Sequence, residues 1–157
     1  MPKTAPRGAS RLRRATLADL DAIAALEEVC FQDYRRASRG SLRRSLASPK
    51  QSVWVVDAYG GSGLAALLVL WHFPHRVRIY DIATHPDARG QGLGAVLMAH
   101  AESEARGAGC QWLSLEAEQA DPRLVGWYEG QGFTTVARLR DFYHDGCHAL
   151  RMVRPLR

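Results

Sequence analysis

The fold is decided by the stretch His85–Met98, HPDARGQGLGAVLM, in which three glycines alternate just before an aliphatic run. Glycine within a helix costs about 1 kcal/mol relative to alanine, so three of them at the start of a helix need a reason. Residues 77–85, which lead into this stretch, are rich in β-branched and aromatic residues and predict a strand. The sequence therefore predicts a strand, a glycine-rich turn and a helix in succession.

This arrangement predicts an anion site at the start of the helix. The first amide groups of a helix have no partner within it, and the helix dipole adds positive charge at the same place. Glycine has no Cβ, so the main chain can approach a phosphate oxygen closely. Arg89 can add a charge-assisted contact. We therefore expect a phosphate or pyrophosphate ligand at Gly90, Gly92 and Gly94.

Two common nucleotide-binding motifs do not fit this turn. The P-loop requires a lysine after its last glycine, and the chain has lysine only at positions 3 and 50. The dinucleotide motif is met loosely by Gly90, Gly92 and Ala95, but five residues separate the strand from the first glycine. Only about 60 residues follow, which is too few for the rest of a doubly wound domain.

The other segments predict a single α/β or α+β domain. A helix is expected after Thr16, with Leu17 and Val29 on its apolar face. Another is expected after Asp121, a residue type that favours the N-cap position. We expect a mixed central sheet of about six or seven strands flanked by about four helices. The predicted strands are 10–16, 52–59, 63–73, 77–85, 110–118, 134–143 and 148–155.

Size and composition favour one domain at residues 10–157, after a disordered lead at residues 1–9. The chain has 157 residues, of which 46% are hydrophobic, enough for one core. It has no run of 18 apolar residues and no apolar centre of a secretory signal, so we expect no membrane partner and a cytoplasmic location. Three distant cysteines predict no disulfide framework. No metal site is expected, because no complete set of four ligands is evident among the suitably spaced residues His72, His75, His144, Cys147 and His148.

The net charge of +5 comes almost wholly from arginine, which supplies 19 of the 21 basic residues. Five arginines fall within residues 34–44, and Arg35, Arg39 and Arg43 would share one face if the segment were a helix. Two interpretations stay open for this cluster. It is either a solvated surface or a basic rim that attracts an acidic partner.

Residues 79–98, IYDIATHPDARGQGLGAVLM, resemble the acetyl-CoA-binding segment of the GNAT family of N-acetyltransferases. The family signature [RQ]-x-x-G-x-[GA] is filled by Arg89, Gly92 and Gly94, and the resemblance extends from about Arg11 to the C-terminus. It implies a GNAT fold whose helix N-terminus holds the pyrophosphate of coenzyme A. The preceding strand would offer main-chain groups to the pantetheine and the thioester carbonyl. The cofactor-binding residues so implied are Ile82, Ala83, Thr84, Arg89, Gly90, Gln91, Gly92, Leu93, Gly94 and Ala95.

Acetyl transfer also needs a proton for the departing thiolate and a base for the amine. Tyr128, in a segment similar to the family's LYxxxGF, is the predicted acid, and a tyrosine pKa of about 10 keeps its hydroxyl protonated near neutral pH. Glu116, on the polar face of the half-buried strand predicted at 110–118, is the predicted general base, with Glu118 as its rival. The bacterial ribosomal-protein alanine N-acetyltransferases, which this segment resembles, carry a glutamate twelve residues before the tyrosine, as Glu116 stands before Tyr128.

The acceptor implied by this resemblance is the α-amine of a protein or peptide N-terminus. Phe142 and Tyr143 lie where such enzymes carry a tyrosine-bearing loop around the peptide, although Phe142 lacks the hydroxyl. Asp121 stands where the family usually has asparagine, so the amide donor toward the cofactor is lost. An α-amine has a pKa near 7.7–8.0, against about 10.4 for lysine, so one carboxylate would suffice as its base.

Other functions remain open at this point. The acceptor could be a small-molecule amine, or the chain could be a non-catalytic acyl-CoA-binding sensor. A nucleic-acid partner is not expected, because no reading motif or regularly interleaved aromatics accompany the basic residues. An acidic or a ribosomal protein is among the candidate acceptors, and a monomer or a homodimer is expected.

Overall fold

The structure, a computed structural model, describes residues 12–156. Their strands form a seven-stranded mixed sheet in the order β1-β2-β3-β4-β5-β7-β6. The strands are β1 (Leu12–Arg14), β2 (Gln51–Asp57), β3 (Leu64–His72), β4 (Arg76–Thr84), β5 (Trp112–Glu118), β6 (Thr134–His144) and β7 (Cys147–Pro155). The α-helices are α1 (Leu20–Cys30), α2 (Arg39–Ala47), α3 (Leu93–Gly107) and α4 (Pro122–Gly130). Short 3₁₀ helices are η1 (Leu17–Asp19), η2 (Asp33–Arg35) and η3 (Pro86–Ala88).

The predicted fold class is confirmed in its sheet and in its helices. The predicted disordered lead at residues 1–9 lies outside the described residues. None of the described helices combines the length and apolar character needed to cross a membrane.

The chain divides into two compact units. The first contains the described residues up to Leu70 together with Asp81–Ala99, and the second contains Trp71–Tyr80 together with the residues from His100 onward. Strand β4 and helix α3 therefore contribute residues to both units, and each unit is described by itself below.

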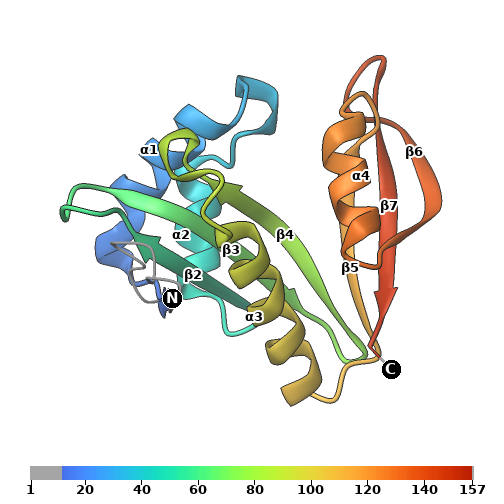
Figure 1. Cartoon of the computed structure of the whole chain (residues 1–157), viewed down its shortest axis with the longest axis horizontal. Helices are drawn as coiled ribbons and strands as arrows, with labels where there is room; N and C mark the ends of the chain where they lie inside the picture. Colours follow the sequence, from blue (N-terminus) through green and yellow to red (C-terminus); the bar gives the residue numbers. More distant parts are fainter. Residues whose placement is uncertain (1–11, 157) are drawn as a thin grey trace, which may run out of the picture. The chain divides into compact units, whose positions relative to one another are not determined.

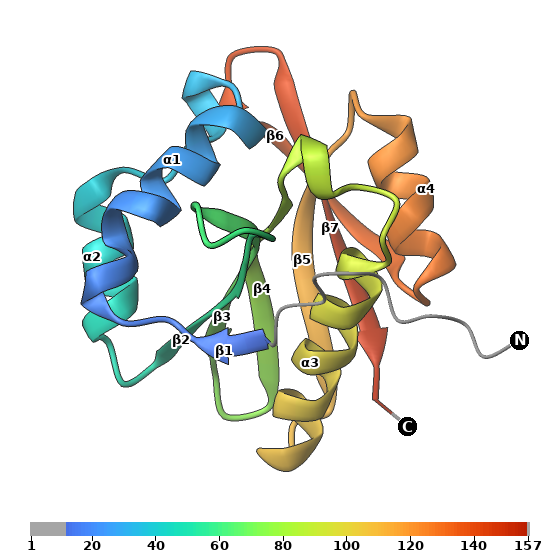
Figure 2. The ribbon, with the colours of Figure 1, turned by 60° about the vertical axis from the view of Figure 1, so that its left-hand side comes forward.

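In the first unit, β3 is buried along nearly its whole length, as its continuous apolar run predicts. Helices α1 and α2 lie side by side (Figure 2), and Ile23 and Leu42 are among their buried residues. Strand β1 is antiparallel to β2, and the Arg13 guanidinium bridges Asp19 and Asp57 at 2.8 and 2.9 Å. This bridge ties β1, η1 and the end of β2 together.

One expectation about this unit was wrong in detail, and the condition set for the arginine cluster is not met. Thr16 precedes η1 rather than an α-helix, and Leu17 lies before α1, which begins only at Leu20, and is 60% exposed. Val29 lies within α1 but is 53% exposed. The arginine cluster does not form one helix. The Ser38 side chain accepts the N–H of Ser41 and caps α2, so Arg35 lies outside that helix in η2.

The second unit joins residues Arg76–Arg78 of β4 to β5 in parallel, and adds β7 and β6 as antiparallel strands. Helix α4 packs against β5 (Figure 1), and begins as predicted with Asp121 as its N-cap. The alternating face of β5 differs from the expectation. Ser114 is 2% exposed and the Glu116 side chain 7%, so β5 is covered on its polar face as well.

Candidate active site

The glycine-rich turn follows β4 and η3 and leads into α3, as predicted. Gly90 and Gly92 both have φ of 78°, a conformation that other residues adopt only with strain of about 1–2 kcal/mol. A Cβ built on either glycine would meet no atom of the described part of the chain within 4 Å. Packing against other residues therefore does not explain why glycine stands at these two positions. The positive φ explains it, together with the open space that lets a ligand approach the backbone closely.

The start of α3 presents the donors that the sequence predicts. Because Leu93 is the first residue of α3, and the amide of Val96 bonds to the Gly92 carbonyl at 3.2 Å, the amides of residues 93–95 precede the first bonds within the helix. Arg89 is exposed, and its Nε donates to the Thr84 carbonyl at 3.3 Å, which braces the turn. Gly94 lies in the first turn of α3 and has an ordinary helical backbone.

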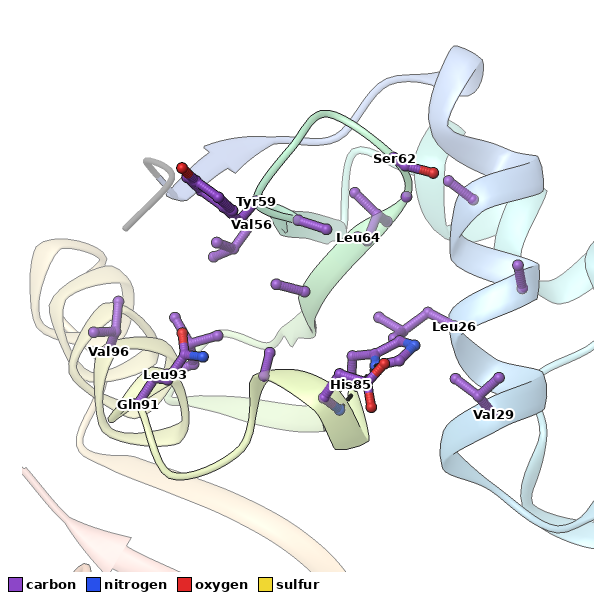
Figure 3. A pocket seen from close by; sticks show the side chains of 17 residues that line it. Leu26, Val29, Val56, Tyr59, Ser62, Leu64, His85, Gln91, Leu93 and Val96 are labelled. Carbon is purple, nitrogen blue, oxygen red and sulfur yellow. Dashed lines mark hydrogen bonds and ion pairs between the residues drawn. The ribbon is translucent and has the colours of Figure 1, made fainter. Parts of the chain in front are cut away.

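A pocket of about 700 Å³ adjoins this turn within the first unit (Figure 3). Leu26 and Val29 of α1 lie on one side of the pocket, and Leu93 and Val96 of α3 lie on the other. Its lining is mostly apolar. Of the predicted cofactor-binding residues, Gln91 and Leu93 line it, whereas the segment 82–84 does not. The pocket suits an apolar group better than a phosphate.

Glu116 of β5 is held between two arginines of the second unit. Its Oε2 accepts from Arg78 Nε at 2.8 Å, and its Oε1 accepts from Nε and Nη2 of Arg151, each at 3.2 Å. Arg151 lies directly opposite Glu116 in the β5–β7 ladder. The Glu116 side chain is only 7% exposed, and those of Arg78 and Arg151 are 19% and 40% exposed. Both carboxylate oxygens of the predicted base are therefore occupied.

Arg78 is itself fixed by two aromatic rings. The rings of Trp71 and Tyr80 stack with centroids 4.5 Å apart, and the Arg78 guanidinium lies 4.9 Å and 5.6 Å from their centroids. The rival Glu118 is engaged elsewhere, because its Oε1 accepts from the Cys147 thiol at 3.0 Å. The two glutamates of β5 thus occupy different environments.

Tyr128, the predicted acid, is buried in α4 with 5% of its surface exposed. Its ring meets that of Phe133 edge to face, with centroids 5.9 Å apart, and lies near the ring of Trp127, with centroids 5.2 Å apart. These contacts fix the ring and would survive removal of the hydroxyl.

Phe142 and Tyr143 lie near the end of β6, and their rings meet at 89° with centroids 5.0 Å apart. Phe142 is 42% exposed. The neighbouring Asp141 has φ of 54° and accepts the Gly146 amide at 2.8 Å, which holds the β6–β7 turn in shape. The predicted cofactor-binding residues 82–95 belong to the first unit, whereas both predicted catalytic and both predicted acceptor-binding residues belong to the second.

The remaining predictions concern metal ligands, the cap residue and the cysteines. No group of three or more potential ligands gathers among the described residues. The Asp121 side chain accepts the Leu124 amide at 3.1 Å, so it acts as the expected cap. Burial raises the pKa of both the Cys30 and the Cys110 thiol, so neither is activated as a nucleophile.

Two carboxyl groups of the first unit, Glu27 of α1 and Asp81 of β4, were not predicted from the sequence. Glu27 is 1% exposed. The pKa of Asp81 is raised well above its usual range, mainly by burial and secondly by the neighbouring carboxyl of Glu27. A signal existed in the helical spacing, because Glu27 comes four residues after the buried Ile23 and therefore shares its face.

Comparison with known proteins identifies the family. The Acetyltransferase (GNAT) family matches residues 20–133, which is most of the chain. Serotonin N-acetyltransferase 2, chloroplastic, of Oryza sativa subsp. japonica is 30% identical over 133 residues, covering 82% of this chain and 63% of that protein. Streptothricin acetyltransferase of Streptomyces lavendulae is 36% identical over 84 residues, covering 51% of this chain and 44% of that protein.

The [ribosomal protein bS18]-alanine N-acetyltransferase of Escherichia coli (strain K12) is similar in both sequence and structure. It is 36% identical over 67 residues, covering 41% of this chain and 44% of that protein. Its crystal structure superposes with a TM-score of 0.82 at 21% identity, over 93% of each chain. The matched sequence spans less than two thirds of the length of each of these curated relatives. The extent of the family match shows that this chain belongs to the GNAT acetyltransferase family.

Proposed function

We propose that this protein transfers an acetyl group from acetyl-CoA to the α-amine of a protein or peptide N-terminus. The observation that carries the proposal is the glycine turn. Gly90 and Gly92 have positive φ, a Cβ added to either would meet no atom of residues 12–156 within 4 Å, and the first amides of α3 follow at once. A backbone of this kind suits a diphosphate.

The residues of this turn fit acetyl-CoA. The amides of Leu93, Gly94 and Ala95 would hold the diphosphate, with Arg89 adding a positive charge. Main-chain groups of residues 82–84 would position the pantetheine and the thioester carbonyl, as the family resemblance implies. Acetyl-CoA, when bound, supplies the activated acetyl group. Polarisation of the carbonyl by backbone N–H groups requires no charged side chain.

Two further side chains are proposed for the proton transfers, as the family resemblance implies. As the amine nitrogen forms its bond to the carbonyl carbon, Glu116 takes a proton from that nitrogen, directly or through water. As the carbon–sulfur bond breaks, Tyr128 donates its hydroxyl proton to the departing sulfur. Because both oxygens of Glu116 accept from arginines, proton transfer to Glu116 becomes easier when one of those contacts loosens. Arg151, the more exposed partner, is the one expected to yield.

The N-terminal acceptor is supported by the alanine N-acetyltransferase of Escherichia coli, whose name assigns it ribosomal protein bS18 as substrate. The exposed Phe142, packed against Tyr143, offers an aromatic surface to the first residues of a peptide. A cytoplasmic location is part of the proposal, and three cysteines that are free thiols support it.

A small-molecule amine is the second candidate acceptor. It is favoured by the likeness to the serotonin and streptothricin acetyltransferases, of which the serotonin enzyme matches a larger share of this chain than the alanine N-acetyltransferase does. A non-catalytic acyl-CoA sensor would instead bind acetyl-CoA without releasing a thiol.

A thiol-release assay separates these candidates. Peptides with different free N-termini are compared with lysine peptides whose N-termini are blocked, and with serotonin and streptothricin. The proposal predicts release with free N-termini and little with blocked peptides. Reaction with the small amines alone would assign the second candidate, and acetyl-CoA binding with no release on any amine would assign the sensor.

A further inference from the structure

Arg151 of β7 and Arg78 of β4 hold the carboxylate of Glu116 in different ways. The Arg78 contact is short, at 2.8 Å from Oε2, and the Arg78 side chain is 19% exposed. Arg151 places two nitrogens on the single oxygen Oε1, each at 3.2 Å, and its side chain is 40% exposed. A guanidinium binds a carboxylate most strongly when two parallel hydrogen bonds reach both oxygens. Arg151 therefore makes the weaker and the more accessible of the two contacts.

Arg78 is also the more firmly fixed of the two arginines. Its guanidinium lies 4.9 Å and 5.6 Å from the ring centroids of Trp71 and Tyr80. Arg151 makes no ion pair other than the one with Glu116, and no ring contact, within the part of the chain that the structure describes. Arg151 can therefore leave Glu116 without breaking another interaction of that kind.

The charges of this cluster do not balance. One carboxylate, Glu116, stands between two guanidinium groups, so the three side chains together carry one excess positive charge. Arg78 alone is enough to neutralise Glu116, which leaves the charge of the half-exposed Arg151 to be matched by another anion. The chain as a whole has a net charge of +5, which favours the approach of an anionic molecule.

We propose that Arg151 determines acceptor specificity by binding a carboxylate that the acceptor carries next to its amine. This inference rests on the proposed function. Arg151 exchanges Glu116 Oε1 for the acceptor's carboxylate, which its planar guanidinium can bind through two nitrogens. A cation in contact with a carboxylate disfavours its protonation, so the departure of Arg151 assists the transfer of the amine proton to Oε1. The acceptor would thus release the base that it needs.

The acceptor's carboxylate has to lie close to its amine, because the amine proton and Arg151 compete for the same oxygen of Glu116. Successive residues of an extended chain are at most about 3.6 Å apart, so the carboxylate belongs to the first or second residue of a peptide. Aspartate or glutamate supplies it there, and the α-carboxylate supplies it in a free amino acid. The expected acceptors are therefore N-termini with an acidic residue at position 1 or 2.

The test compares kcat/KM for thiol release with matched acceptors. Two amidated peptides differ only in aspartate or asparagine at the first residue, and a second pair differs in the same way at the second residue. Alanine and alaninamide form a third pair, which tests a free amino acid as the source of the carboxylate. The wild type should prefer the aspartate member of at least one peptide pair by at least about 5-fold.

Arg151→Met and Arg151→Gln should reduce this preference to less than about 2-fold, and the loss should appear as a higher KM for the aspartate peptide. Two variants are used because glutamine can still donate a hydrogen bond to Glu116 Oε1 if methionine prevents folding. Arg154→Met is the matched control, because Arg154 lies on the opposite face of β7 and pairs with Glu102 at 3.0 Å. It should keep the preference, and thermal unfolding is measured for all three variants.

The outcomes separate this inference from the proposed function. If no peptide is acetylated but alanine is preferred to alaninamide through Arg151, the proposed function fails and the carboxylate role of Arg151 stands. If peptides are acetylated with no preference for the carboxylate member of any pair, the role of Arg151 is overturned. A preference that survives in both Arg151 variants, or that Arg154→Met abolishes equally, would overturn it as well.

Discussion

Arg151 and Glu116 face each other across the β5–β7 ladder, and two nitrogens of the arginine lie 3.2 Å from the same carboxylate oxygen, Oε1. Arg78 occupies the other oxygen at 2.8 Å. The predicted base is therefore also the centre of a charged cross-strand cluster. Its chemical and structural roles have to be separated by experiment.

Glu116→Gln should lower kcat at least about 100-fold, because the glutamine cannot take the proton from nitrogen. It should also lower the free energy of unfolding by about 1–3 kcal/mol, since two arginines lose a charged partner. Both are measured on the same preparation, by thiol release and by urea unfolding.

Arg151→Met is the matched control for that variant. It frees Oε1 and keeps the carboxylate on Arg78, so it should also lose stability but retain transfer within about 10-fold of the wild type. Equal losses of kcat in Glu116→Gln and Arg151→Met would instead make Glu116 a structural anchor.

Tyr128→Phe should slow thiol release by about 100-fold or more at saturating acetyl-CoA, because the departing sulfur loses its proton donor. The affinity for coenzyme A, measured by calorimetry, should stay within about 3-fold, because the ring contacts with Trp127 and Phe133 remain. Tyr80→Phe, which keeps the stack on Trp71, is the control and should turn over at nearly the wild-type rate. An undiminished rate in Tyr128→Phe would remove the acid role.

Gly92→Ala should weaken acetyl-CoA binding by at least about 10-fold, because the methyl group stands where the diphosphate would approach and φ of 78° strains alanine. Gly109→Ala is a matched control, since Gly109 has φ of 72° and equally open surroundings. Gly109→Ala should lose as much stability as Gly92→Ala, and its affinity for acetyl-CoA should stay at the wild-type value. Similar affinities in the two variants would contradict a diphosphate site at Gly92.

Arg13→Met should lose up to about 1 kcal/mol of stability near neutral pH, a modest value because Arg13 and Asp57 are both more than a third exposed. The Arg13 guanidinium lowers the pKa of Asp19 and Asp57, so its contribution is present above the unfolded pKa of about 3.9 and fades as pH falls through the lowered values. Urea unfolding measured below and above this pH should show that the free energies of unfolding of Arg13→Met and the wild type become equal at low pH.

Arg14→Met is the control for Arg13→Met. Its guanidinium lies 5.2 Å from the centroid of the Trp54 ring rather than beside a carboxylate. The stability that Arg14→Met loses should therefore not depend on pH over this range. A difference between Arg13→Met and the wild type that persisted unchanged at low pH would exclude the proposed bridge as its source.

The sequence predicts the fold well, because its signals are local. The turn needs Gly90 and Gly92 because their backbones have positive φ. The N-cap at Asp121 forms through a hydrogen bond from the Leu124 amide, only three residues further along the chain. Such patterns fix elements wherever tertiary contacts do not override them.

The surroundings of the site residues were harder to predict, because they depend on contacts between distant segments. Alternation along β5 identifies Glu116 but cannot reveal that Arg78 and Arg151 cover it from two other strands. The Glu27–Asp81 pair similarly joins residues 54 positions apart. The roles of Glu116, Tyr128, Phe142 and Tyr143 stay predictions.

A crystal structure of the protein with coenzyme A tests the central claim most directly. The account predicts the diphosphate within hydrogen-bonding distance of the amides of residues 93–95, above Gly90 and Gly92. A diphosphate bound at any other surface of the molecule, with these amides left to solvent, would contradict it.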